Sequence, residues 1–224
     1  ACEALIDVEF PVGCVMVYDG KVISRGRRTN SRSPHENELD HAEIMALRSA
    51  GEALGNYRLR DCDLYVTLEP CAHHGQTPPC SQALIGAGVA RVVVATGDPD
   101  SRVAGRGIRM LRDAGIIVDC GVGEAEALRD HAGFFVGVTE NRPFVTLKLA
   151  GTLDGRIATA SGESQWITGP EARCAVHMMR ARHDAVMVGA GTVRADDPSL
   201  TVRGMGVTRQ PVRVVLSRAM KIPA

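Results

Sequence analysis

The first part of the chain alternates between short apolar runs and amphipathic stretches, a pattern typical of an α/β domain. Apolar runs bounded by turn residues predict strands over residues 12–18, 21–25, 64–68, 89–95 and 116–118. Helical spacing predicts helices over residues 41–49, 80–85, 107–114 and 124–138, with Gly51 ending the first and Gly86 or Gly88 the second. Asp19-Gly20 is a hairpin signal, and a polar loop is expected over residues 26–40. Because strands and helices alternate, we expect a largely parallel sheet.

A polar stretch near residues 139–142 separates this domain from a second unit. The expected organisation is one domain over residues 1–141 and a second α/β domain over residues 142–224. The chain does not begin with Met and stops soon after its last expected strand, so we expect a fragment whose second domain is incomplete. The elements predicted for the second unit are strands over residues 144–150, 185–188 and 212–216, a loop over residues 151–168 and a helix over residues 170–182.

Composition and charge narrow the classes of function. Apolar residues make up 45% of the chain and charged residues 23%, an ordinary globular balance. The 26 basic and 26 acidic residues cancel, and no segment is strongly basic, which argues against nucleic acid as a partner. No apolar run approaches the roughly 20 residues of a membrane helix, so no membrane partner is expected. The seven cysteines are odd in number and scattered, which favours a reducing compartment, and the cytoplasm is the expected location.

The clearest chemical signal is a set of metal-ligand residue types spread over the first domain. His41 is followed two residues later by Glu43, and Cys71 and Cys80 come further along the chain. One His and two Cys are three ligands of the kind that zinc prefers, and a catalytic zinc site leaves its fourth position open for water. Zinc lowers the pKa of that water to about 7, and a nearby carboxylate such as Glu43 can then move protons. The pattern is that of zinc nucleobase deaminases, in which the Glu is not a metal ligand.

Two other interpretations of these residues remain open. Two cysteines flanking a proline-rich loop are also typical of a structural zinc site, and the chain would then be a zinc-stabilised, non-catalytic module. His73 and His74 lie between the cysteines and are further possible ligands, although we expect them to line the pocket.

The segment TLEPCAHHGQTPPC, residues 67–80, resembles the zinc loop of the bifunctional deaminase/reductase family of riboflavin biosynthesis. Eight residues separate its two cysteines, whereas most relatives in the cytidine-deaminase superfamily have two. The motifs LKLA, SGESQWIT and GTVRADDP of the second unit resemble the start of that family's reductase domain. By contrast, the motifs PVG, HAEIMALR and NYRL, in about the first 60 residues, resemble tRNA adenosine deaminase.

The family resemblance implies a fold class and a set of sites. It implies a cytidine-deaminase-like three-layer α/β/α domain followed by a partial dihydrofolate-reductase-like α/β domain that uses NADPH. By resemblance, the positions expected to contact NADPH are Ala150, Trp166, Thr192 and Asp196, and those expected to bind a phosphoribosyl substrate are Ser164, Arg180, Leu200 and Arg203.

The implied reaction is deamination of 2,5-diamino-6-(5-phosphoribosylamino)pyrimidin-4(3H)-one, with Zn²⁺ held by His41, Cys71 and Cys80 and protons moved by Glu43. Reduction of the ribosyl group to ribityl by NADPH would follow. The partner is then a small phosphoribosyl pyrimidine, and a homo-oligomer is possible because the reductase fold of this family commonly dimerises. The alternatives are a tRNA or other nucleobase adenosine deaminase and the non-catalytic zinc module.

Overall fold

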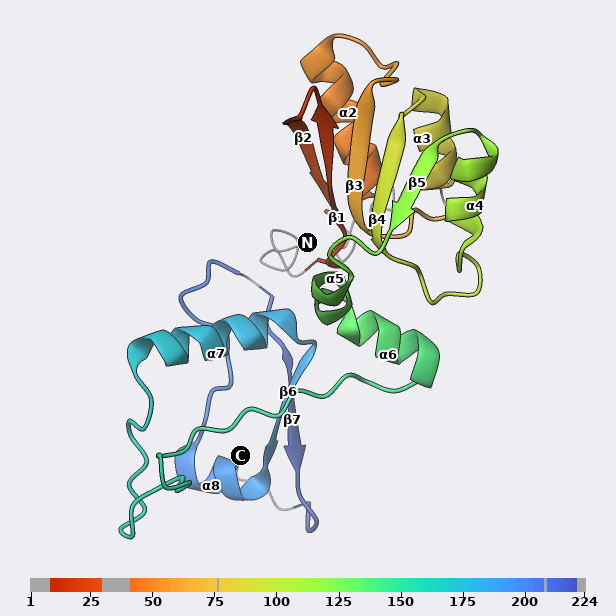
Figure 1. Cartoon of the computed structure of the whole chain (residues 1–224). Coiled ribbons are helices and arrows are strands. Elements are labelled where there is room, and N and C mark those ends of the chain that lie inside the picture. The colour runs from red at the N-terminus through yellow and green to blue at the C-terminus, as the bar shows by residue number, and fades with distance from the viewer. Residues whose placement is uncertain (1–8, 30–40, 76, 208, 221–224) are drawn as a thin grey trace. The chain divides into compact units, whose positions relative to one another are not determined.

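The computed structural model describes residues 9–29, 41–75, 77–207 and 209–220, and the chain divides into two compact units, Ala1–Val145 and Thr146–Ala224 (Figure 1). Each unit is described by itself. The boundary between the domains, expected at residues 141/142, stays a prediction. Most of the loop expected over residues 26–40 lies outside the described residues.

The first unit is built on a five-stranded sheet with the strand order β2-β1-β3-β4-β5. β1 pairs antiparallel with both β2 and β3, whereas β3–β4 and β4–β5 are parallel. The expectation of a largely parallel sheet is therefore wrong for half of the pairings. The tight Asp19-Gly20 hairpin makes β2 antiparallel to β1, and only the later strands are joined by helical crossovers. The strands are Gly13–Tyr18 (β1), Lys21–Arg27 (β2), Cys62–Leu68 (β3), Arg91–Thr96 (β4) and Ile117–Cys120 (β5).

Helices α2, α3 and α4 cover one face of this sheet, and α5 packs against β3 and β4 (Figure 1). The apolar core lies between the sheet and these helices, where Met16, Leu64, Leu84 and Leu111 are fully buried. The helices of the first unit are Ala42–Leu54 (α2), Cys80–Ala87 (α3), Arg106–Asp113 (α4), Glu124–Asp130 (α5) and Ala132–Glu140 (α6).

Two helix predictions for the first unit are wrong in detail. Gly51 does not end α2, which continues to Gly55, where the chain turns in the left-handed conformation (φ 61°). Gly51 is instead a buried helical position, and a side chain there would overlap the ring of Tyr57. The helix expected over residues 124–138 is two helices that meet at His131, whose buried ring packs against Phe10.

The second unit contains α7 (Pro170–Arg182), β6 (Ala185–Gly189), α8 (Ala190–Asp196) and β7 (Val212–Leu216), and its two strands pair in parallel. Residues 144–150 do not form the expected strand. Leu147 and Leu149 are 80% and 76% exposed, and no strand among the described residues pairs with this segment, so its apolar pattern has no sheet to join. The short helix α8 was not expected, because two turns are too few to show a helical period.

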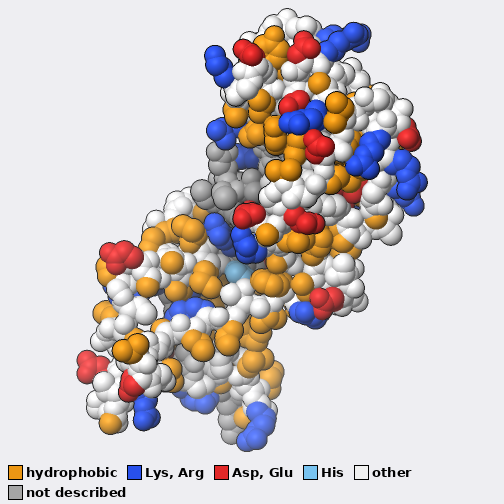
Figure 2. Space-filling model, viewed as in Figure 1, with side chains coloured by type: hydrophobic (Ala, Val, Ile, Leu, Met, Phe, Trp, Pro, Cys, Tyr) orange, Lys and Arg blue, Asp and Glu red, His pale blue; other side chains and the backbone are white. Residues whose placement is uncertain are grey.

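Acidic and basic side chains are interspersed on the face shown in Figure 2, in keeping with the zero net charge of the chain. Among the described residues, no helix combines the length and the apolar character that crossing a bilayer requires.

Candidate active site

The start of α2 brings His41 and Glu43 to the same side of the first unit. His41 caps the helix in an extended conformation (φ −62°, ψ 144°), and Glu43 lies in its first turn. The helix can approach β2 closely because β2 carries Gly26 at this point, where a Cβ atom would overlap the Ala42 carbonyl group. A hydrogen bond also connects α2 to β2: the Ser24 hydroxyl donates to the Ala46 carbonyl oxygen at 2.8 Å.

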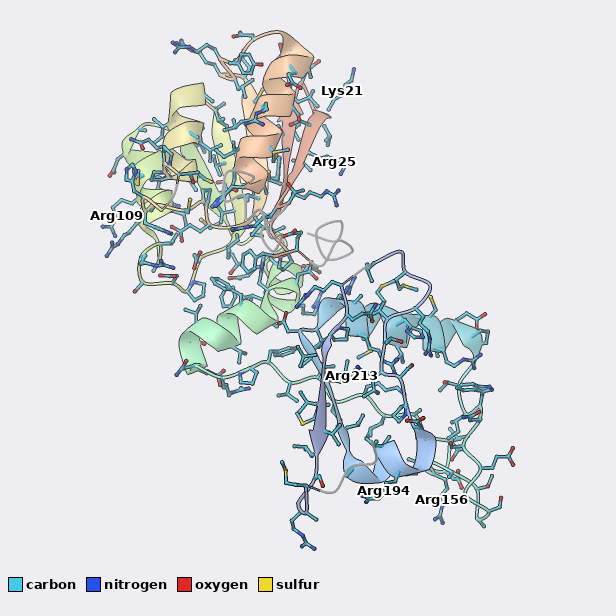
Figure 3. All side chains as sticks on the ribbon, turned by 180° about the vertical axis from the view of Figure 1, so that it is seen from behind. Lys21, Arg25, Arg109, Arg156, Arg194 and Arg213 are labelled. Carbon is cyan, nitrogen blue, oxygen red and sulfur yellow. The ribbon has the colours of Figure 1, made fainter. Side chains whose placement is uncertain are left out.

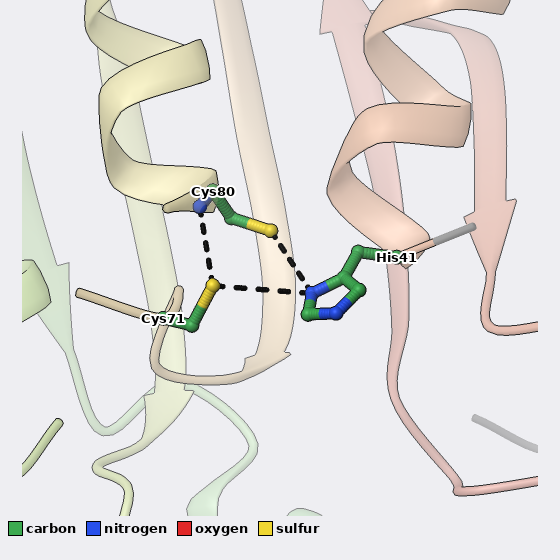
Figure 4. Close-up of side chains that lie close together, drawn as sticks. All are labelled: His41, Cys71 and Cys80. Atoms are coloured by element: carbon green, nitrogen blue, oxygen red, sulfur yellow. Dashed lines mark hydrogen bonds between the residues drawn. The ribbon is translucent and has the colours of Figure 1, made fainter. Parts of the chain in front are cut away.

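Cys71 and Cys80 reach the same place from the loop after β3 and from the first residue of α3 (Figure 4). The Cys80 backbone N–H donates to the Cys71 Sγ at 3.1 Å, and the Ser81 N–H and hydroxyl both donate to the Cys71 carbonyl oxygen. The His41 Nδ1 lies 3.2 Å from the Cys80 Sγ and 3.9 Å from the Cys71 Sγ. Residues far apart in the sequence are therefore joined into one cluster by the ends of two helices and one loop.

The three side chains fit zinc. Their ligand atoms all lie within 4.8 Å of one another. A tetrahedral site with ordinary zinc–sulfur and zinc–nitrogen bonds separates a sulfur from a nitrogen by roughly 3.6 Å. The two observed separations, 3.2 and 3.9 Å, lie on either side of that value. Imidazole and thiolate are also the donors that zinc prefers, so these residues could hold the ion without rearrangement of the backbone.

The electrostatics of the cluster favour a thiolate at Cys71. Hydrogen bonding with the Cys80 and His41 side chains lowers the pKa of the Cys71 thiol to about 4, against the effect of burial. The same hydrogen bond, together with burial, raises the pKa of Cys80. The interaction with Cys71 also raises the pKa of His41. One negative charge is thus already stabilised among the three ligands, and a divalent cation would favour deprotonation of the second thiol as well.

Glu43 is the buried carboxyl group of this site, with 4% of its surface exposed. Burial raises its pKa, and the neighbouring Cys71 thiolate acts in the same direction. A carboxyl group with a raised pKa beside three candidate zinc ligands is suited to accept and release a proton near neutral pH.

The cluster opens into a pocket of about 420 Å³. Sequence reasoning placed His73 and His74 on its wall; His73 lines it and His74 is not among its lining residues. Other lining residues were not singled out, because residue type alone does not show which charged or apolar side chains the fold brings to the pocket. These residues are Phe10, Val12, Arg28, Leu68, Glu69, Asp98, Asp100, Arg102, Val103 and Phe134.

Glu69 holds the loop that forms the far wall of the pocket. Its carboxylate accepts hydrogen bonds from the N–H groups of Asp98 (3.3 Å), Gly105 (2.9 Å) and Ile108 (3.2 Å). The side chain is 3% exposed, so these three donors replace the water that a buried carboxylate loses. Because Glu69 comes two residues before Cys71, its hydrogen bonds connect the loop that carries Cys71 to the loop that carries Asp98.

The residues predicted to bind the phosphoribosyl group partly come together in the second unit. Arg180 on α7 donates from Nη1 to the Thr201 carbonyl oxygen at 3.0 Å, which places it beside the buried Leu200. The positive charge of Arg203 lowers the pKa of Arg180, second to burial. Arg203 is held by the Ser199 hydroxyl, and its N–H donates to His177 Nδ1 at 3.2 Å. Sequence reasoning had not singled out His177. Ser164 is exposed in the segment before α7.

The positions predicted to contact NADPH are more scattered. Thr192 and Asp196 lie one turn apart on α8, whereas Ala150 and Trp166 lie in segments without helix or strand. Trp166 is 69% exposed, and the Arg173 guanidinium lies over its ring at 4.5 Å. The roles of all these residues stay predictions.

Comparison with known protein families indicates the class of each part of the chain. Residues 1–96 match the cytidine and deoxycytidylate deaminase zinc-binding region, and residues 143–224 match the RibD C-terminal domain. The protein thus combines a cytidine-deaminase-like domain with a domain of the RibD C-terminal type, which confirms the expected fold class and supports the expected Zn²⁺ and NADPH.

Whole-chain relatives define the family more narrowly. The chain is 47% identical to the riboflavin biosynthesis protein RibD of Aquifex aeolicus over 95% of its length, and 44% identical to that of Escherichia coli over 94%. It resembles a solved diaminohydroxyphosphoribosylaminopyrimidine deaminase/5-amino-6-(5-phosphoribosylamino)uracil reductase from Thermotoga maritima with a TM-score of 0.82, 47% identity and coverage of 93% of this chain and 56% of that one. The chain is therefore of the RibD type, as the sequence motifs indicated. It spans 56% and 58% of the length of the two curated relatives.

Proposed function

We propose that this chain acts in riboflavin biosynthesis as a zinc-dependent deaminase of 2,5-diamino-6-(5-phosphoribosylamino)pyrimidin-4(3H)-one. The observation that carries the proposal is the convergence of His41, Cys71 and Cys80 on one point, with the buried Glu43 in the same pocket. A purely structural zinc site would not need a buried carboxyl group beside an open pocket. The RibD relatives supply the substrate class, since the Thermotoga protein is described as a deaminase of such a pyrimidine.

His41 Nδ1 and the two sulfur atoms are the proposed zinc ligands. Bound there, zinc would act as a Lewis acid that activates a water molecule for attack on the ring carbon bearing the amine. Glu43 accepts one proton from the attacking water at its carboxylate and passes it to the ring nitrogen. It then accepts the second proton from the hydroxyl group on the attacked carbon and passes it to the departing amine, which leaves as ammonia while the carbonyl group forms. Burial raises the pKa of Glu43, which makes the carboxyl group a better proton acceptor than an exposed one.

The pocket walls supply the remaining requirements of this reaction. Phe10 and Phe134 pack edge to face, with ring centroids 5.0 Å apart, and offer an apolar surface for a flat pyrimidine ring. The loop held by Glu69 presents Asp98, whose carboxylate can accept hydrogen bonds from amino groups of the ring.

For the second unit we propose NADPH-dependent reduction of the ribosyl group to ribityl. Ala150, Trp166, Thr192 and Asp196 are the proposed NADPH contacts, and Ser164, Arg180, Leu200 and Arg203 the proposed substrate contacts. NADPH would supply a hydride to the ribosyl carbon. Arg180 and Arg203 support the assignment. Burial and then the charge of Arg203 lower the pKa of Arg180, and two guanidinium groups this close favour a bound phosphate. We also propose a cytoplasmic location, which suits a protein with free cysteines, and a possible homo-oligomer.

An ammonia-release assay tests the deaminase. The zinc-loaded chain is offered the phosphoribosyl pyrimidine in one reaction and a tRNA anticodon stem-loop in another. We expect ammonia only from the pyrimidine. Release from the RNA alone would replace the proposal with the tRNA adenosine deaminase, and no release from either with zinc bound would favour the non-catalytic zinc module.

A further inference from the structure

Arg28 stands at the edge of the deaminase pocket, directly after the end of β2. Its backbone N–H donates to the Val12 carbonyl oxygen at 3.4 Å, which continues the pairing of β1 with β2 by one residue. Both Arg28 and Val12 line the pocket that contains His41 and Glu43. The backbone of the sheet therefore fixes the position of Arg28 relative to the candidate zinc cluster.

The two arginines of the pocket differ in their surroundings. Arg102 is bound to Asp100, with Nη2 2.6 Å from one carboxylate oxygen and Nε 3.1 Å from the same oxygen. By contrast, the Nε of Arg28 is buried and has no hydrogen-bond partner among the residues that the structure describes. An unpaired buried donor costs roughly 1–3 kcal/mol. Arg28 therefore carries a donor that is still available to a ligand in the pocket.

The charge of the pocket also favours a role for Arg28 in anion binding. Four carboxyl groups line the pocket, those of Glu43, Glu69, Asp98 and Asp100, against two guanidinium groups. An anionic substrate group would be repelled over most of this surface. Because Arg102 is already neutralised by Asp100, Arg28 offers the more favourable position for a negative charge.

We propose that Arg28 binds the phosphate of the phosphoribosyl group when the pyrimidine ring is held in the deaminase pocket. The inference rests on the proposed function and adds a residue that determines the specificity of that reaction. A guanidinium group can donate two parallel hydrogen bonds to a phosphate, from Nε and one Nη, and such pairs are strong and directional. A neutral ring carbonyl would not compensate the charge of a half-buried guanidinium group to the same degree.

The test compares two substrates that differ only in the phosphate. One is the phosphoribosyl pyrimidine, and the other is the same compound after enzymatic removal of the phosphate. Ammonia release is measured for the full zinc-loaded chain and for Arg28→Gln and Arg28→Lys. The matched control is Arg25→Gln, because Arg25 lies on β2, three residues before Arg28, but is exposed and points away from the sheet into solvent (Figure 3).

We expect Arg28→Gln to lower kcat/KM for the phosphorylated substrate by roughly 10- to 100-fold. The dephosphorylated substrate should change by less than about 3-fold, because it never uses the contact. Arg28→Lys should retain part of the preference, since a lysine keeps the charge but not the bidentate geometry. Arg25→Gln should match the unaltered chain on both substrates. An equal loss on both substrates, or no loss on either, would overturn the proposal.

A binding measurement tests the role of Arg28 independently of the proposed reaction. Titration calorimetry with ribose 5-phosphate is performed on chains carrying Arg180→Gln and Arg203→Gln, so that the proposed anion site of the second unit does not contribute. We expect binding that Arg28→Gln weakens by roughly 10-fold or more, with ribose as the negative control. Unchanged binding would refute the role of Arg28 even if the deaminase were active. If the chain binds ribose 5-phosphate through Arg28 but releases no ammonia, only the proposed reaction fails.

Discussion

His41 and Glu43 are two residues apart, a spacing at which side chains in the middle of a helix do not share a face. Both nevertheless reach one pocket, because His41 caps α2 in an extended conformation and Glu43 lies in the first turn. The change from extended to helical backbone between these positions turns the imidazole toward the two sulfurs. The proposed division of work, with one residue as ligand and the other as proton carrier, depends on this local geometry.

Replacement of Glu43 by Gln tests the proton-transfer role. The amide keeps the size of the side chain but cannot accept the proton, so kcat should fall by roughly a hundred- to ten-thousand-fold. Zinc content, measured by atomic absorption, should stay at the level of the unaltered chain. His41→Ala is the comparison variant and should lose zinc and activity together. Retained activity in Glu43→Gln would assign the proton transfer to another group.

His131 should make the first unit sensitive to moderate acid. Its ring is 1% exposed, and burial lowers its pKa from 6.5 to about 4. Between these values the unfolded chain binds the proton more readily than the folded one, so stability is lost as the pH falls through this range. From about pH 7.5 to about pH 5 this group alone should reduce the free energy of unfolding by about 2 kcal/mol.

Denaturant unfolding at the two pH values measures this effect in the unaltered chain and in His131→Gln. The Gln variant should be less stable at the higher pH, but its loss on acidification should be smaller by about 2 kcal/mol. The same loss in both chains would show that other groups cause the acid sensitivity.

At the scale of elements, the site is assembled by the close approach of α2 to β2 and by the two loops that Glu69 joins. At Gly26 on β2, the first turn of α2 leaves no space for a side chain. At Gly107 on α4, the Pro70 carbonyl group likewise leaves no space for a side chain. Both glycines have ordinary backbone conformations, so space and not backbone freedom requires them. They let the two ligand-bearing segments pack closely against their neighbours.

Gly26→Ala should therefore destabilise the first unit and disturb the metal cluster. The added methyl group would overlap the Ala42 carbonyl, and overpacking of this kind costs roughly 1–3 kcal/mol. Denaturant unfolding and zinc affinity, measured by competition with a chelator, should both decline. Gly86→Ala is the matched control, because it lies exposed within α3 with nothing near its Cβ position and should be neutral or stabilise by up to about 1 kcal/mol. Equal behaviour of the two variants would contradict this account of the packing.

At the scale of the whole molecule, the two units differ in how well they are packed. The main apolar core lies in the first unit, whereas the described residues of the second unit include few buried apolar ones: Ala181, Ala190, Leu200, Val202 and Pro211. The segment before α7 contains no helix or strand and exposes Leu147, Leu149 and Leu153. Local opening should therefore begin in the second unit.

Limited digestion with trypsin checks this difference. Cleavage at Lys148 or Arg156, both exposed in the segment without helix or strand, should precede cleavage at Arg48 in α2 or Arg91 in β4. Mass spectrometry of the early fragments identifies the sites. Early cleavage at Arg48 or Arg91 would mean that the first unit is the less stable one.

Much of the fold could be predicted from local patterns. The bounds of α7 and β7 agree with the apolar periodicity, and those of β1, β3 and α3 differ from it by one or two residues. The errors occur where a distant partner decides the outcome. Gly51 lies within α2, where the ring of Tyr57 occupies the space that a side chain would need, and among the described residues no strand pairs with residues 144–150.

What the sequence determined by itself is the chemistry: the types and spacing of His41, Glu43, Cys71 and Cys80 already indicated zinc and proton transfer, because ligand preference belongs to the side chain. The tertiary structure alone decided which other residues share their pocket. Arg28, Glu69 and Asp98 come from separate loops, and no local pattern distinguishes a charged group that lines a pocket from one on the open surface. Their significance depends on burial and on the partners that long-range packing supplies, and neither is encoded in the neighbouring residues.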